Sequence, residues 1–349
     1  MPTPNLRRTL ERVRIFGLGD AGPEVGDIQQ RLQALGADID STEVDGRFGP
    51  STEAAVRTFQ ESRLLRVDGI VGPDTWGQLV EAGYRLGDRT LYLHSPLFRG
   101  DDVRVLQRKL NALGFDTGRE DGLFGVDCDR AFREFQRNVG EVPDGIVGLH
   151  ALASLERMRP QESAPSRAMV REEEELRQMR ASIEGQVIAI EAGMTTGSTA
   201  PRTRAIAEAL ADELTALGAK PVIVGGEGAS MASEGAREAN ELGAAMCVSL
   251  RLPASPEASA PTCSYFGSAS TYSPAGMLLA QTILEELEAD AGAPGHLQRS
   301  TGAMLRETRM LAVQVEPMVQ AGTTGDIEQA AADRIGLAVA AGIRRFFRT

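Results

Sequence analysis

The residues that could do chemistry in the second half of this chain follow short apolar runs. Met194 lies at the tip of a polar turn in "VIAIEAGMTTG" (187–197), Arg251 follows "MCVSL", and Glu316 ends "LAVQVE". Such runs predict buried strands, and loops at strand ends commonly carry catalytic residues. A carboxylate such as Glu316 can act as a general base or a metal ligand. The thioether of Met194 and the guanidinium of Arg251 suit neither role.

A hydrolytic zinc site needs about three nitrogen, oxygen or thiolate ligands and an open position for water. His296 is the only histidine of the second half, and an Arg251 cation about 4 Å from Zn²⁺ would repel it by roughly 8 kcal/mol at an effective dielectric near 20. An unorthodox site using Cys247, Cys263 or His296 is the remaining alternative. Without a metal, Glu316 contributes only about 10²–10⁴-fold as a general base. We therefore expect no cofactor, and we expect Arg251 and Glu316 to pair.

The elements that would position these residues alternate between strand and helix. Apolar runs predict strands at 187–190, 221–224, 246–250 and 312–315, and amphipathic patterns predict helices at 201–218, 233–243, 274–292 and from 326 to the C-terminus. This alternation predicts an α/β domain with a mostly parallel sheet. The glycine-rich "VGGEGAS" lacks the dinucleotide fingerprint and the lysine of a P-loop, so it does not indicate a nucleotide site.

The first half contains an internal repeat. "DIQQRLQALG" (27–36) returns as "VLQRKLNALG" (105–114), "DGRFGPSTEAAVRTFQ" (45–60) returns as "DGLFGVDCDRAFREFQ" (121–136), and "DGIVG" occurs twice. In each copy, segments with apolar residues at helical spacing are separated by Asp-Gly turns. This pattern predicts a small three-helix unit. We expect Ser51 to cap the second helix of the first copy.

Composition limits the classes of partner. The chain has 349 residues, a net charge of −12 and three cysteines. An acidic chain does not favour nucleic acid or an anionic membrane, and an odd, sparse set of cysteines does not indicate a disulfide framework. Its start lacks the apolar region of about 7–15 residues found in secretory signals, and no run reaches about 18 apolar residues. We therefore expect a cytoplasmic protein without membrane insertion.

The repeats resemble the peptidoglycan-binding domain 1 family, which implies two all-α modules that hold glycan strands or peptide stems. We define module 1 as residues 14–86 and module 2 as residues 92–158, followed by a linker with a helix at 159–182 and a domain at 183–349. Most motif residues are expected to shape turns and core rather than to touch ligand. These peptidoglycan-binding motif residues are Asp45, Phe48, Gln60 and Asp68 in module 1, and Asp121, Phe124, Gln136 and Asp144 in module 2.

The second half resembles the amidase 3 family of N-acetylmuramoyl-L-alanine amidases, most specifically in "MLRETRMLAVQVE". That family implies a zinc hydrolase that cuts the amide between muramic acid and the stem peptide. By this resemblance, three metal-ligand positions fall on Met194, Thr199 and Arg251, and all three have lost the ligand. The catalytic glutamate position falls on Glu316, which would be vestigial.

The combination resembles an actinobacterial group of CwlM-type pseudo-amidases, which share the "SLR" replacement of the ligand histidine. This resemblance implies a regulator of peptidoglycan precursor synthesis, with the enolpyruvyl transferase of the first committed step as its partner. Two alternatives stay open. One is an active zinc-dependent amidase, and the other is an adaptor that only binds peptidoglycan or its precursors.

Overall fold

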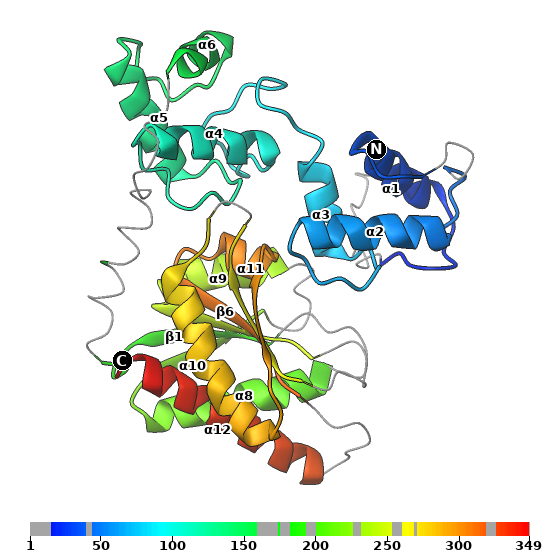
Figure 1. The fold of residues 1–349 in the computed structure, drawn as a ribbon. Helices are drawn as coiled ribbons and strands as arrows, with labels where there is room; N and C mark the ends of the chain where they lie inside the picture. Colours follow the sequence, from blue (N-terminus) through cyan, green and yellow to red (C-terminus); the bar gives the residue numbers. More distant parts are fainter. Residues whose placement is uncertain are drawn as a thin grey trace, which may run out of the picture.

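The protein was analysed as a computed structural model that describes residues 15–39, 44–158, 174, 182–192, 200–225, 232–252, 260–268, 271–318 and 326–348. Two helical modules precede an α/β domain (Figure 1), so the predicted fold class is confirmed. Met194, Thr199 and most of the predicted linker 159–182 lie outside the described residues.

Each module is built from three short helices around its own apolar core. Module 1 contains α1 (Pro23–Ala34), α2 (Pro50–Ser62) and α3 (Pro73–Glu81), and module 2 contains α4 (Asp101–Ala112), α5 (Val126–Asn138) and α6 (Leu149–Arg157). The expected cap at Ser51 is wrong, because α2 begins at Pro50 and Gly49 is its N-cap. Proline suits the first helical position, since its missing N–H would have no helical partner there.

The α/β domain contains one six-stranded sheet in the order β2-β1-β3-β6-β4-β5. Neighbouring strands are parallel except for β4, which is antiparallel to β6. The apolar runs of the sequence predict four of these strands, and the structure adds β4 and β5. The strands are β1 (Val187–Glu191), β2 (Lys220–Val224), β3 (Met246–Leu250), β4 (Thr262–Phe266), β5 (His296–Ser300) and β6 (Leu311–Glu316).

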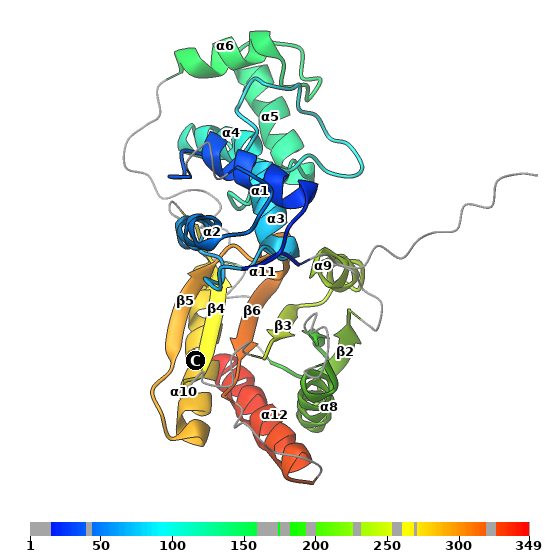
Figure 2. The same cartoon turned by 90° about the vertical axis from the view of Figure 1, so that its right-hand side faces the viewer.

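Helices cover both faces of this sheet (Figure 2). α8 (Ala200–Ala216), α10 (Pro274–Ala291) and α12 (Asp326–Phe346) pack on one face and bury the main apolar core there. α9 (Ala232–Glu241) and α11 (Ala303–Glu307) pack on the other face over a smaller cluster. No helix in the described part of the chain is long and apolar enough to cross a membrane.

The modules contact the α/β domain around α11 (Figure 1). Arg306 of α11 forms an ion pair with Glu81 at the end of α3, with Nη1 2.5 Å from Oε2, and both side chains are almost fully buried. The next residue, Glu307, forms an ion pair with Arg99 of module 2. Thr301, just before α11, donates from Oγ1 to the carbonyl oxygen of Arg63 at 2.5 Å. One short helix therefore contacts both modules.

Candidate functional site at the strand ends

The polar residues of the central strands lie together on one face of the sheet. Side chains alternate between faces along a strand. Ala189, Cys247 and Ala312 belong to the cluster under α9 and α11, while their strand neighbours belong to the main core. By this alternation, the α9/α11 face also carries the polar side chains at the carboxyl ends of β1, β3 and β6, which are Glu191, Ser249, Arg251, Gln314 and Glu316.

Glu191 is a buried carboxylate that our sequence analysis missed. It is 2% exposed and accepts a hydrogen bond from Ser249 Oγ at 2.5 Å. Two glycines make room for its side chain, because a Cβ at Gly235 would lie 3.0 Å from Glu191 Cγ and one at Gly225 would lie 3.4 Å from the same atom. A charged residue closing an otherwise apolar strand was the available signal in the sequence.

Arg251 stands directly after β3, and its backbone N–H continues the ladder by donating to the carbonyl of Val315 at 2.9 Å. Its Nε is buried and has no hydrogen-bond partner in the part of the chain that the structure describes. Burial disfavours the charged guanidinium, yet the pKa of Arg251 is raised, because Glu191, Asp74 and Glu316 favour the cation. Asp74 belongs to α3, so module 1 contributes to the electrostatics of the strand ends.

The direct pair that we expected between Arg251 and Glu316 is not formed, since no ion pair joins these two described side chains. Glu316 Oε1 instead accepts a hydrogen bond from Gln314 Nε2 at 3.0 Å, and Glu316 favours the Arg251 cation from a longer distance. The Gln314 amide, on the same strand, is the hydrogen-bond partner of this carboxylate. Three carboxylates, rather than Glu316 alone, favour the charged form of Arg251.

These side chains do not fit a catalytic zinc ion. The Arg251 cation lies among the carboxylates that would have to bind the metal, and Glu191 is already hydrogen-bonded to Ser249. Cys247 and Cys263 lie on opposite faces of the sheet, in separate clusters, so they cannot share one ion. Within the described ranges, no three His, Cys, Asp or Glu side chains gather as a metal site would require.

In module 1, the motif residues hold turns together. Gln60 is buried and accepts a hydrogen bond from the Gly69 N–H at 2.9 Å, while its Nε2 donates to Asp68 at 2.8 Å. Asp45 accepts a hydrogen bond from the Arg47 N–H, and Phe48 is buried in the core. These contacts give the motif residues a structural role, and whether any of them also touches ligand stays a prediction.

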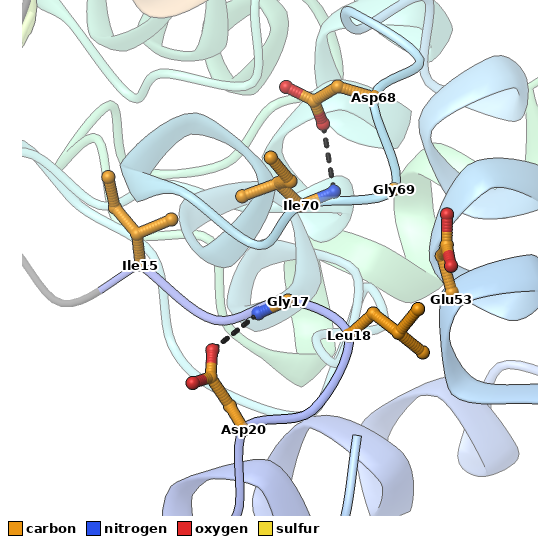
Figure 3. A pocket seen from close by; sticks show the side chains of 8 residues that line it. All are labelled: Ile15, Gly17, Leu18, Asp20, Glu53, Asp68, Gly69 and Ile70. Carbon is orange, nitrogen blue, oxygen red and sulfur yellow. Dashed lines mark hydrogen bonds between the residues drawn. The ribbon is translucent and has the colours of Figure 1, made fainter. Parts of the chain in front are cut away.

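A shallow pocket of about 440 Å³ lies beside one of these turns in module 1 (Figure 3). Its rim combines the carboxylates of Asp20, Glu53 and Asp68 with the exposed apolar side chains of Leu18 and Ile15. Asp20 and Asp68 each accept a hydrogen bond from a nearby backbone N–H, as the dashed lines in Figure 3 show. Both carboxylates therefore also stabilise the loops that form the pocket.

Module 2 repeats the same turn chemistry. Gln136 accepts from the Gly145 N–H at 2.9 Å and donates to Asp144 at 2.8 Å, and Phe124 is fully buried. Hydrogen bonds from Gln136 and the Ile146 N–H lower the pKa of Asp144. Burial raises the pKa of Asp121 to about 6, although it accepts a hydrogen bond from Gln107.

Comparison with known proteins finds relatives of this chain. Residues 21–79 and 99–155 each match the family described as a putative peptidoglycan binding domain. The N-acetylmuramoyl-L-alanine amidase CwlM of Mycobacterium tuberculosis is 36% identical over 330 residues, which cover 85% of this chain and 80% of that protein. The amidase CwlL of Bacillus licheniformis is 33% identical over 161 residues, covering 40% of this chain and 45% of that protein.

A solved structure matches about half of the chain. The N-acetylmuramyl-L-alanine amidase Ami1 of Mycobacterium smegmatis aligns with a TM-score of 0.40 and 18% identity, covering 48% of this chain and 99% of Ami1. The similarity to CwlM covers most of both chains, at an identity and coverage that establish kinship. The chain therefore belongs to the CwlM family of amidase-like proteins.

Proposed function

We propose that this chain binds peptidoglycan or its precursors through its two modules, and that its amidase-like domain is catalytically inactive and regulates precursor synthesis by binding. The observation that carries the proposal is Arg251, a partly buried cation at the strand end where the amidase 3 resemblance puts a zinc ligand. The two matches to a putative peptidoglycan binding domain support the binding part.

Hydrolysis of an amide needs a polarised carbonyl and an activated water, and zinc supplies both in the amidases that this domain resembles. Arg251 cannot lose its proton to become a ligand, and it repels a divalent cation. Glu316 is left with a hydrogen bond from Gln314, and no described residue beside it is shown to activate water. A carboxylate alone accelerates such a reaction by about 10²–10⁴-fold, far below the rate enhancement of a hydrolytic enzyme.

By the CwlM-type resemblance, the protein acts in the cytoplasm, and its partner is the enolpyruvyl transferase of the first committed step of precursor synthesis. The test combines two assays on the purified full chain. In the first, muropeptides are incubated with the chain and Zn²⁺, and we expect no release of stem peptide. In the second, the transferase of the same organism is assayed with increasing amounts of the chain, and we expect its rate to change saturably.

The name of the Mycobacterium tuberculosis relative favours a second function, a zinc-dependent amidase. Release of stem peptide that disappears in a Glu316→Gln variant would establish that function and contradict ours. An unchanged transferase rate together with retained binding to peptidoglycan would instead leave an adaptor, the third reading of the sequence.

A further inference from the structure

Module 1 lies against the same side of the α/β domain that carries the strand-end residues. Its helix α3 ends at Glu81, which contacts Arg306 of α11, and begins next to Asp74, which acts on Arg251. The end of α2 provides a second contact, where the backbone of Arg63 and Leu64 accepts hydrogen bonds from Thr301. Module 1 therefore contacts the α/β domain through the end of α3 and through the end of α2.

We propose that module 1 is a docked cap over the face of the sheet that carries Arg251 and Glu316. The buried Glu81–Arg306 ion pair holds α3 in this closed arrangement, and an open arrangement exposes the strand-end face when the pair breaks. This inference goes beyond the proposed function and does not depend on it, because it concerns the movement of module 1 alone.

The chemistry of this contact suits reversible docking. Taking Glu81 and Arg306 out of water costs free energy that largely offsets their attraction, so such a pair fixes orientation more than it adds stability. Arg306 Nε remains buried without a hydrogen-bond partner among the described residues, which adds to this cost. Thr301 adds two hydrogen bonds to module 1, and the buried apolar cluster of module 1 includes no described residue of the α/β domain. Polar contacts between domains of one chain separate more readily than apolar ones.

A pocket open to solvent lies beside α3. Its volume is about 510 Å³, and it is lined by Trp76 and Asp74 of α3 on one side and by Thr301, Ala303 and Arg306 on the other. Side chains of module 1 and of the α/β domain therefore face one another across open space here, as at a contact between two docked surfaces.

Arg306 also joins module 2 to this arrangement. It forms an ion pair with Glu307, whose carboxylate binds Arg99, and Asp121 and Arg104 of module 2 lie within its electrostatic reach. A separate bridge joins the modules directly, because Arg63 binds Asp101 of α4 through both guanidinium nitrogens, at 2.8 and 2.7 Å. Release of module 1 therefore requires the Glu81–Arg306 pair to break, and it strains the Arg63–Asp101 bridge as well.

Trp76 is the only tryptophan of the chain, and it lines this pocket while also packing against the core of module 1, so all tryptophan fluorescence comes from this region. The test introduces Glu81→Arg into the full chain, which opposes Arg306 with a second cation. The matched control is Glu53→Arg, the same charge change in module 1 at a residue that pairs with Arg57 and does not contact the α/β domain. Small-angle X-ray scattering and acrylamide quenching of Trp76 are measured for both variants and for the unmodified chain.

We expect Glu81→Arg to enlarge the radius of gyration, shift the Trp76 emission to the red and increase its quenching constant, with an unchanged far-ultraviolet circular dichroism spectrum. We expect Glu53→Arg to match the unmodified chain. If Glu81→Arg keeps the original scattering and quenching, the cap is not held by this pair and the proposal is overturned. If Glu81→Arg loses helical signal, the milder Glu81→Gln decides between the same two outcomes.

Discussion

Modules 1 and 2 share a scaffold but differ in what their third helices contact. In both, a buried glutamine accepts a hydrogen bond from the backbone N–H of a turn glycine. Gln60 accepts from Gly69 in module 1, and Gln136 accepts from Gly145 in module 2. The third helix of module 1 ends at Glu81, which is 5% exposed because Arg306 covers it. The corresponding residue of module 2 is the exposed Arg157.

The start of the third helix shows the same contrast. Asp74 of module 1 acts on Arg251, whereas His150, its counterpart, pairs with Glu141 of its own module. Leu149, at the first position of α6, is 79% exposed. The repeat therefore keeps the residues that make the fold and changes the residues that make contacts. A repeated motif predicts the fold of each copy well and its partner poorly.

Substitutions in the apolar cores should give the largest change in unfolding free energy, because the two modules carry side chains of different size at the same core position. Phe132 of module 2 is fully buried and occupies the position of Val56 in module 1. Phe132→Ala should cost about 3–5 kcal/mol of unfolding free energy, and Val56→Ala should cost less, because it leaves a smaller cavity. Hydrogen exchange of peptides from each module in the full chain measures both. Equal losses would mean that the two cores tolerate truncation alike.

The buried glutamines should give the next largest effect. Gln60→Ala leaves the Gly69 N–H without its partner and also removes donors to Asp68 and Thr75. A buried group left unsatisfied costs about 1–3 kcal/mol. Gln136→Ala should cost less, because Ala151 stands where module 1 has Thr75, so Gln136 makes fewer bonds. Urea unfolding of the two variants tests the order, and a larger loss for Gln136→Ala would reverse it.

Asp121 should make the stability of module 2 depend on pH. Burial raises its pKa from 3.8 to about 6, so the folded state binds a proton more readily than the unfolded state. Protonation therefore stabilises the fold as pH falls from about 6 towards 4, and this stabilisation is lost as pH rises through 6. Asp121→Asn should remove this part of the change in melting temperature between pH 7 and pH 5. Asp45→Asn, at the exposed equivalent in module 1, should not.

The smallest effect should come from the exposed end of α6. Arg157→Gln should change the unfolding free energy by no more than about 0.5 kcal/mol, because exposed substitutions seldom do more. Glu81→Gln, at the matching position of module 1, should cost more, since it leaves Arg306 without one of its two carboxylates. Thermal melts of both variants measure the difference. An equal effect would show that burial of the ion pair contributes nothing.

Local sequence patterns predicted those helices and strands whose apolar spacing or turn residues are visible along the chain. The repeat and its Asp-Gly turns predicted both modules, and apolar runs predicted four strands. β5 was missed because "HLQRS" is a largely exposed, mostly polar edge strand, and β4 was missed because "TCSYF" mixes polar and apolar residues and forms no continuous apolar run. Only the register of the strands in the structure shows which residues share the α9/α11 face. Nothing in the sequence links Arg306 to Glu81, which lies 225 residues earlier.

The strand ends show the same separation of scaffold and chemistry as the modules. The strands that would carry an amidase site are present, and the side chains on their α9/α11 face form a set of hydrogen-bonded carboxylates around the Arg251 cation. We propose that such a set of side chains does not hold zinc.

Elemental analysis tests that claim most directly. The untagged full chain is purified without chelator, and its zinc content is measured before and after zinc is added back and excess metal is removed. The account predicts near zero zinc per chain in both samples. Near one zinc per chain, retained after dialysis, would contradict it and would require a site that includes residues beyond those described.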